Sequence, residues 1–581
     1  MAKLSLSSLV ALVKGDSRVP VVVGLVCLSL LLAWPNFAPR QKGLPDVNVD
    51  SFEGAVLAAD YASRQNNLIA EAFYFTKAHR LNPTDMRILD RLFSVKLVLG
   101  DLEAACKLAG KLVAMNPHHA KARLVLAAAA VKGNEPGEAA QQAAMVLADD
   151  SARVAAGMLA LWAGQMAGDD SITIPALVEL ENESLLTGPA LRNIALFHEF
   201  TGDTARAEEV YESVIKAHGL LSVDHALDFL FFLHRSNMDE QRNFFFKNIG
   251  GQHDGHAVYR HIRPLLDEAP EALSITEPEA LARGFYDVAA FERQGRNLRD
   301  KLSYIRIANW MAPSRRGVMA MADILAELSL FDEAIAAYET IRQDDLFGET
   351  VRASIALLHE ANDAPDMAIR LLEREVAADD SRFSVKLIAD MLRRQEKYDQ
   401  AEAYYTSIID GLGTVERHDW ELFYGRGIVR ERLGNWPGAE ADLLVAKDLS
   451  GDRPYVLNYL GYSWIDNGEN VEQGLAMVEQ AVQAEPNNGY FVDSLGWAFY
   501  RLGDFQKAVK FLEHATMLQP GDPEIIDHLG DALWQVGRQF EARYQWQRVL
   551  TLEISEEKRE QVERKIDIGV FEAHQGQKLA I

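Results

Sequence analysis

The chain has only two cysteines among 581 residues, Cys27 and Cys106. Cys27 lies in an apolar N-terminal run and Cys106 in a segment with a helical pattern, so we expect no disulfide framework. Positive charge is also scarce: 59 Lys and Arg stand against 85 Asp and Glu, which gives a net charge of −26. This argues against general nucleic-acid binding, which needs a basic surface. Because the acidic residues are dispersed, they indicate solubility, with a preference for basic partners as the alternative.

Signatures of catalysis are absent from the sequence. There is no phosphate-binding loop, no G-x-S-x-G elbow and no H-E-x-x-H. The best metal candidate is HDGHAVYRH, which contains His253, His256 and His261. Its spacing matches no structural zinc pattern and no cysteine is near, so we interpret it as a polar loop that enters a helix. We therefore expect no enzymatic activity, no metal and no cofactor.

What the sequence does contain is a repeat of about 34 residues. Two series of glycines are each spaced 34, 35 and 34 residues apart: Gly427, Gly461, Gly496 and Gly530, and Gly434, Gly468, Gly503 and Gly537. Such a period indicates helix-turn-helix units stacked into a solenoid. Small residues such as Gly496 and Ala508 let two antiparallel helices approach closely. Gly503 is placed at the turn, where a left-handed backbone costs least, and Pro520 ends the second helix.

The copy GYFVDSLGWAFYRLGDFQKAVKFLEHATMLQP resembles the tetratricopeptide repeat. The residues that carry the resemblance are Leu495, Gly496, Phe499, Ala508, Ala515 and Pro520. Weaker copies upstream include FDEAIAAYETI and TGDTARAEEVYESVI. The predicted fold is all-α, a right-handed superhelical solenoid of roughly ten to thirteen helix pairs.

The pattern also predicts how the chain is divided. We expect a cytoplasmic tail (1–18), a transmembrane anchor or uncleaved signal (19–38), a linker (39–50), degenerate repeats (51–217), an irregular aromatic-rich helical region (218–280), further repeats (281–416), a regular array (417–554) and a closing helix with a tail (555–581). A polar-faced closing helix is expected because a solenoid must cover its last apolar face.

The predicted anchor begins with VPVVVGLVCLSLLLAW, which has no charged residue. Sixteen helical residues span roughly 24 Å, and extension to Ala38 gives about 30 Å, enough for a bilayer. Lys3, Lys14 and Arg18 precede the run, which predicts a cytoplasmic N-terminus and an exported remainder.

Three alternatives to an uncleaved anchor are open. A cleaved signal peptide could end at Ala38, but Asn36 and Pro39 are poor neighbours for cleavage. A lipoprotein site at Cys27 would need small residues before it, where Leu25 and Val26 stand. The third alternative is a buried core helix, although the segment lies outside the repeats.

The region from about Ala280 onward, with WELFYGRGIVRERLGNWPGAEADL and DHLGDALWQVGRQFEARYQWQRVL, looks like a family of exported tetratricopeptide proteins of Gram-negative alphaproteobacteria. The resemblance implies an N-terminal export signal or lipid anchor and a chain made almost wholly of repeats. It implies no catalytic activity.

In tetratricopeptide repeats the first helix of each pair lines a concave groove. By that resemblance, the groove-facing residues are Tyr455, Asn458, Tyr462, Asp466, Tyr490, Asp493, Trp497, Tyr500, Arg501, Glu524, Asp527, Asp531 and Trp534. Asn458, Asp493 and Asp527 recur once per repeat, and such short polar side chains could bond an extended peptide backbone. The alternative is that the aromatic residues pack between repeats and the acids are merely solvated.

The predicted function is a non-enzymatic scaffold at the bacterial inner membrane, facing the periplasm, that binds proteins or peptides and no nucleic acid. A cytoplasm-facing adaptor is the first alternative. An accessory subunit of an envelope enzyme, or an enzyme with a degenerate site near residues 218–280, is the second.

Overall fold

The computed structural model describes residues 49–147, 153–182, 189–218, 223–243, 276–291, 297–341, 348–379 and 381–570. Over these residues the chain forms helices and no strands, which confirms the predicted all-α class. The helices within the described ranges include none with the length and apolar character needed to cross a bilayer. The predicted anchor, residues 19–38, and the His253, His256 and His261 motif lie outside the described residues.

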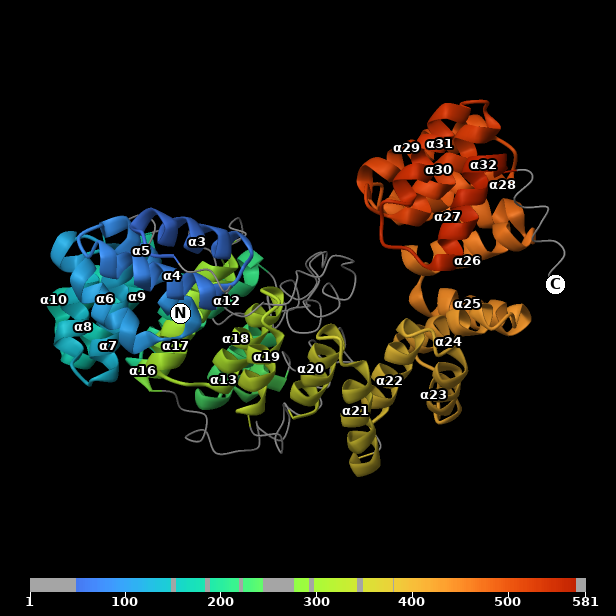
Figure 1. Ribbon diagram of the computed structural model, residues 1–581. Helices are drawn as coiled ribbons and strands as arrows, with labels where there is room; N and C mark the ends of the chain where they lie inside the picture. Colours follow the sequence, from blue (N-terminus) through green and yellow to red (C-terminus); the bar gives the residue numbers. More distant parts are fainter. Residues whose placement is uncertain are drawn as a thin grey trace. The chain divides into compact units, whose positions relative to one another are not determined.

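The chain divides into two compact units, residues 1–371 and 372–581 (Figure 1). The first, unit 1, contains α3 (Phe52–Arg64), α4 (Leu68–Leu81), α5 (Met86–Leu99), α6 (Leu102–Met115), α7 (Ala120–Lys132), α8 (Pro136–Ala144), α9 (Arg153–Ala167), α10 (Asp170–Asn182), α11 (Pro189–Phe200), α12 (Thr204–His218), α13 (Val223–Arg235), α16 (Glu277–Phe291), α17 (Leu298–Met311), α18 (Arg315–Glu327), α19 (Phe331–Glu339), α20 (Gly348–Ala361) and the start of α21 (Pro365–Asp379).

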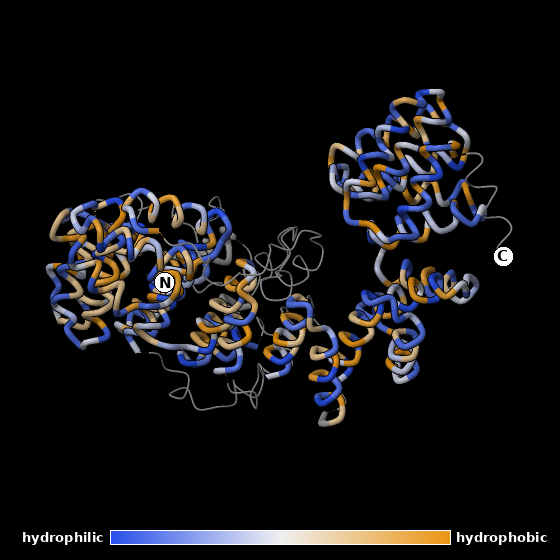
Figure 2. Tube along the Cα trace, viewed as in Figure 1, coloured by the Kyte–Doolittle hydropathy of each residue, from blue (hydrophilic) through white to orange (hydrophobic). Residues whose placement is uncertain are grey.

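Within the described residues, unit 2 contains the rest of α21 and the helices that follow it. They are α22 (Arg382–Arg394), α23 (Tyr398–Asp410), a 3₁₀ turn (Arg417–Asp419), α24 (Trp420–Arg432), α25 (Trp436–Ser450), α26 (Pro454–Asn467), α27 (Val471–Ala484), α28 (Gly489–Arg501), α29 (Phe505–Leu518), α30 (Pro523–Gln535), α31 (Gln539–Val549) and α32 (Glu556–Ile568). Each helix from α22 to α31 packs most extensively on the other member of its pair. Hydrophobic and hydrophilic residues alternate along these helices (Figure 2), as expected where one face of each helix is buried.

Local sequence sets where these helices begin and end. The carboxylate of Asp522 accepts hydrogen bonds from the Glu524 and Ile525 amides at 3.0 Å and so caps the start of α30. At the turns inside the C-terminal pairs, the second glycine series has the left-handed backbone that the sequence predicted. Gly503, for example, has φ +81°.

The first glycine series lies where the two helices of a pair come closest. A Cβ on Gly461 would lie 2.6 Å from the Gly474 carbonyl oxygen, and one on Gly496 would lie 2.6 Å from Cγ of Leu512. The space at Gly530 is taken by the indole of Trp546, which is fully buried. These contacts confirm the close helix approach that the first glycine series predicted.

Unit 1 has a feature that the sequence did not predict. Helices α16 and α17 pack across the first helices of earlier pairs: α17 contacts α5 and α7, and α16 contacts α9 and α11. Nη1 of Arg299 in α17 lies 2.8 Å from Oε2 of Glu71, whose side chain is buried. Asn193 in α11 donates to the Ala280 carbonyl at 3.1 Å, and Arg192 binds Asp287 at 2.7 Å. The chain therefore covers part of its own inner helix face in unit 1.

Candidate functional site

The candidate site is the face of α26, α28 and α30 that carries the thirteen predicted residues; we call it the first-helix face. The helix register fixes which residues lie on it, because consecutive copies are related by 34 or 35 positions. The structure sorts the thirteen residues into three groups. Exposed are Tyr455, Asp466, Tyr490, Arg501 and Glu524; partly buried are Asn458, Tyr462, Trp497, Tyr500 and Trp534; buried are Asp493, Asp527 and Asp531.

Two of the exposed residues are aromatic. Tyr455 and Tyr490 are 52% and 46% exposed, which is high for side chains with so much apolar surface. The Tyr455 ring meets the edge of Phe491 in α28, with ring centroids 5.4 Å apart, so its position is fixed by packing. Flat, immobilised aromatic side chains of this kind are typical anchors of protein interfaces.

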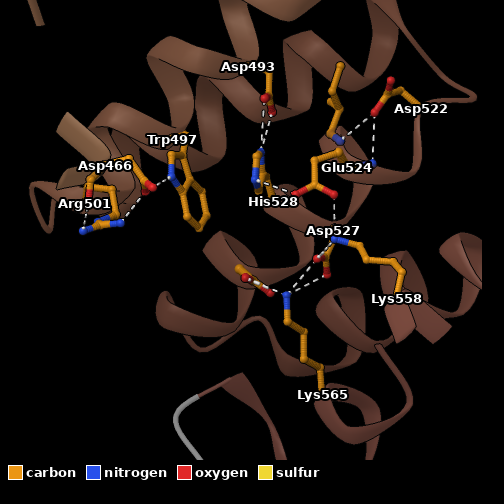
Figure 3. Close-up of polar contacts among 12 residues, drawn as sticks. Asp466, Asp493, Trp497, Arg501, Asp522, Glu524, Asp527, His528, Lys558 and Lys565 are labelled. Carbon is orange, nitrogen blue, oxygen red and sulfur yellow. Dashed lines mark hydrogen bonds and ion pairs between the residues drawn. The ribbon is translucent and has the colours of Figure 1, made fainter. Parts of the chain in front are cut away.

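Toward the other end of the same helices, one ion pair joins α26 to α28 (Figure 3). Nη2 of Arg501 donates to the backbone carbonyl of Asp466 at 2.8 Å, and the guanidinium also binds the Asp466 carboxylate. The indole Nε1 of Trp497 reaches the same carboxylate at 3.5 Å. These three predicted residues therefore form one cluster that links consecutive repeats.

Trp497 also takes part in an aromatic stack. Its ring is stacked on Tyr500, with centroids 4.7 Å apart, and on His528 of the next repeat, with centroids 4.1 Å apart. The stack runs along the junction between α28 and α30. In this place the aromatic residues pack between repeats, as the alternative interpretation of the sequence proposed.

The predicted groove residue Asp493 is buried, and its carboxylate lies 3.0 Å from Nδ1 of His528 (Figure 3). Burial by itself lowers the pKa of the imidazole. The negative charges of Asp493, Glu524 and Asp527 outweigh that effect and raise the pKa of His528 to about 9. At neutral pH, His528 is therefore a buried cation between two repeats.

Asp527 and Asp531 are buried under α32, the last helix of the described residues. Nζ of Lys565 lies 2.8 Å from Asp527 and 2.9 Å from Asp531, and Nζ of Lys558 lies 2.8 Å from Asp527 and 2.6 Å from Glu524 (Figure 3). Burial raises the pKa of Asp531, whereas the lysines lower that of Asp527 despite its burial. These carboxylates hold α32 in place as the closing element.

Asp531 also takes part in a hydrogen bond between a carboxylate and an aromatic side chain that recurs within single repeats. Its carboxylate accepts a hydrogen bond from the Trp546 indole, fifteen residues later, at 3.2 Å. The Tyr405 hydroxyl binds Asp390 in the same way, and Tyr338 binds Asp323, again fifteen residues apart. The acid on the first helix thus satisfies the polar end of a buried aromatic side chain on the second helix.

Several of these partners were missed by the sequence interpretation. His528, Lys558 and Lys565 were not among the predicted residues. A signal for the two lysines did exist, because Lys558 and Lys565 follow Glu524 and Asp531 by 34 residues, which places α32 in the register of a further first helix. Nothing in the repeat pattern singled out His528.

The set Asn458, Asp493 and Asp527 recurs in sequence, but the three side chains have different surroundings. Asp493 of α28 is held by His528 of α30, and Asp527 of α30 is held by the lysines of α32. In contrast, Oδ1 of Asn458 has no hydrogen-bond partner within the described residues and is shielded from solvent. Trp534 packs near Trp546, with Arg543 5.0 Å above its ring. Peptide binding by the thirteen residues stays a prediction.

On the described part of the chain, two further kinds of site are relevant: a metal site and a reactive cysteine. No group of three or more His, Cys, Asp or Glu side chains there could hold a metal ion. Cys106 is a free, half-buried thiol, and burial, with the charge of Glu103, raises its pKa. A raised pKa leaves less of the reactive thiolate at neutral pH.

Comparison with known proteins defines the class of repeat. Two family models described as tetratricopeptide repeat match the chain, one over residues 91–153 and 387–454 and the other over residues 492–524. The chain therefore contains tetratricopeptide repeats, in both of its units. Proteins built from this repeat generally mediate interactions between proteins.

A TPR repeat-containing protein of Pseudomonas aeruginosa is 29% identical over 178 residues, which is 30% of this chain and 27% of that protein. Among solved structures, a chain of the APC/C hetero-tetramer Cut9–Hcn1 is 14% identical with a TM-score of 0.38, covering 89% of this chain and 96% of that chain. MamA from Desulfovibrio magneticus RS-1 is 19% identical with a TM-score of 0.26, covering 29% and 94%.

Proposed function

We propose that this chain is a non-enzymatic scaffold that binds protein or peptide partners on the first-helix face of unit 2. The observation that carries the proposal is the difference between the two units. In unit 1, helices α16 and α17 already cover the first helices α5, α7, α9 and α11. In unit 2, the first-helix face keeps two tyrosines about half exposed.

The residues of that face divide into a contact layer and a support layer. Tyr455 and Tyr490 offer apolar area and hydroxyl groups to a partner. Below them, the Asp493–His528 pair ties consecutive repeats together. A surface held in this way is pre-organised, so a partner loses less free energy to ordering when it binds.

The binding test uses the full chain and two matched double variants. Tyr455→Ala with Tyr490→Ala removes the exposed tyrosines of the first-helix face. Phe540→Ala with Tyr544→Ala removes two aromatic side chains of α31 that are 91% and 61% exposed. Partners cross-linked to the tagged chain in intact cells are quantified by mass spectrometry for each form.

We expect at least one partner to be retained by the α31 variant and to fall about tenfold or more with the tyrosine variant, since hot-spot aromatic residues each contribute about 2 kcal/mol or more. Equal recovery with both variants would exclude the first-helix face as the binding surface. Turnover of a substrate by the purified chain would exclude the non-enzymatic scaffold.

We also propose that residues 19–38 anchor the chain in a bacterial inner membrane, with the repeats in the periplasm and a role in envelope assembly. The support is the charge-free run after Lys3, Lys14 and Arg18. Alkaline phosphatase fused to the C-terminus should be active, because that enzyme matures only outside the cytoplasm. Activity of β-galactosidase at the same position instead would favour the cytoplasm-facing adaptor.

A further inference from the structure

Helices α26 and α27 and nearly all of α28 contain no basic residue. Residues 454–500 have no Lys, Arg or His, although 59 Lys and Arg are spread through the chain. The exposed tyrosines of the first-helix face, Tyr455 and Tyr490, belong to this segment. The segment also carries six acidic residues: Asp466, Glu469, Glu472, Glu479, Glu485 and Asp493.

A carboxylate lies beside each of the two tyrosines. Glu485 and Asp522 belong to the turns that lead from a second helix into α28 and α30. Burial, followed by the negative charge of Glu485, raises the pKa of Tyr455, and burial with the charge of Asp522 raises that of Tyr490. The same neighbourhood of tyrosine and acid therefore recurs in two consecutive repeats.

These two carboxylates have no cation to balance them. Glu485 accepts a hydrogen bond from Nδ2 of Asn488 at 3.0 Å, and Asp522 accepts the amides of Glu524 and Ile525 at 3.0 Å (Figure 3). All of these donors are neutral. Within the described residues neither carboxylate forms an ion pair, so each keeps its negative charge at the protein surface.

The cations that border these acids have other partners. Arg453, just before α26, lies 5.1 Å from the centroid of the Trp420 ring in the preceding repeat. Arg548 donates to the Pro520 carbonyl at 3.0 Å rather than to Asp522. The basic groups on the face itself pair with its other carboxylates; they are Arg501, His528, Lys558 and Lys565. A partner therefore meets two exposed aromatic rings beside two unbalanced negative charges.

We propose that the partner segment bound at Tyr455 and Tyr490 is arginine-rich, with guanidinium groups that pair with Glu485 and Asp522 and lie against the tyrosine rings. The inference rests on the proposed function and adds the chemistry of the partner. Arginine suits the site because its planar guanidinium pairs with a carboxylate through two hydrogen bonds and also stacks on an aromatic face. Opposite charges on the two surfaces favour such a partner over an acidic one.

The test uses the full chain and a fluorescein-labelled nonapeptide of alternating arginine and alanine, with binding followed by fluorescence anisotropy. Matched peptides carry glutamine or glutamate in place of every arginine. The site variant combines Glu485→Gln with Asp522→Asn, which removes both charges and keeps an efficient N-cap for α30. The control variant combines Glu472→Gln with Glu479→Gln, an equal change of charge at two exposed positions of α27.

We expect the site variant to bind the arginine peptide about tenfold or more weakly than the wild type, because two charge-assisted hydrogen-bonded pairs are lost. The control variant should stay within about twofold of the wild type, since its charges are exposed and screened by salt. Equal losses in the two variants would overturn the proposal, because they would mean attraction by net charge alone. Failure of the arginine peptide to bind, or equal or tighter binding of the glutamine or glutamate peptide, would overturn it as well.

The cross-linking test with Tyr455→Ala and Tyr490→Ala separates this inference from the proposed function. Partners that depend on the two tyrosines, together with a peptide affinity that ignores Glu485 and Asp522, would contradict the charge preference alone. Partners that do not depend on the tyrosines would contradict the first-helix face as the binding surface, and this inference with it.

Discussion

The buried pair of His528 and Asp493 makes the stability of unit 2 depend on pH. The pKa of His528 is about 9 in the folded chain, whereas an ordinary imidazole has a pKa of 6.5. Because the folded value is the higher one, the stabilisation is complete below about pH 6.5 and is lost as the pH rises through about 9. A shift of about 2.5 units corresponds to about 3 kcal/mol.

The assay is urea unfolding of the wild type and of His528→Gln, followed by circular dichroism between about pH 6 and about pH 10. The free energy of unfolding of the wild type should fall by about 3 kcal/mol relative to the variant over this interval. Asp493→Asn should reduce that fall, because it removes the main charge that favours the imidazolium. His514→Gln, at an exposed position of α29, serves as the control and should follow the wild type.

Parallel curves for the wild type and His528→Gln would refute the reasoning. They would mean that the pKa of His528 is the same in the folded and the unfolded chain, in spite of the carboxylate 3.0 Å away. A fall in stability toward acid pH, specific to the wild type, would refute it as well, because it would require a folded pKa below the unfolded one.

Three further predictions concern the helix contacts. Gly461→Ala should lower the free energy of unfolding by about 2 kcal/mol, because the added methyl meets the Gly474 carbonyl oxygen and a backbone cannot easily give way. Gly110→Ala, at an exposed position inside α6 with open space around it, should instead raise the free energy of unfolding by up to about 1 kcal/mol. Similar urea midpoints for the two variants would contradict the close approach of α26 and α27 at Gly461. Lys565→Met should cost about 3 kcal/mol, since it leaves the buried carboxylate of Asp531 without its ammonium, and Asp531→Asn should restore part of the loss. An unchanged midpoint for Lys565→Met would mean that α32 is not held by this contact.

The repeat pattern predicted the helix pairs of unit 2 because each residue type in the pattern is needed for a feature that lies within a single repeat. Gly461 permits the helix approach and Gly503 permits the left-handed turn, and both requirements are met within one copy. A single copy of the pattern is therefore enough to predict such features.

The same pattern could not predict which side chains pair across repeats. It placed Asp493 and Asp527 on the first helix of a pair, but their exposure depends on a cation that the helix after next supplies, His528 of α30 in one case and Lys565 of α32 in the other. Burial of a carboxylate is decided by that partner, and the partner lies more than thirty residues away. The packing of α16 and α17 was beyond the pattern for the same reason, since the residues concerned lie far apart in sequence.

The covering of the inner face in unit 1 also changes how this unit must fold. In an open solenoid each repeat contacts its neighbours alone, so folding starts anywhere and spreads, and a lost repeat is tolerated. The bond between Arg299 and Glu71 instead joins residues 228 positions apart. During synthesis, the first pairs leave the ribosome long before α17 exists to cover them, and closure of so large a loop is slow. We therefore expect the removal of one helix pair to unfold unit 1 as a whole, whereas unit 2 would simply become shorter.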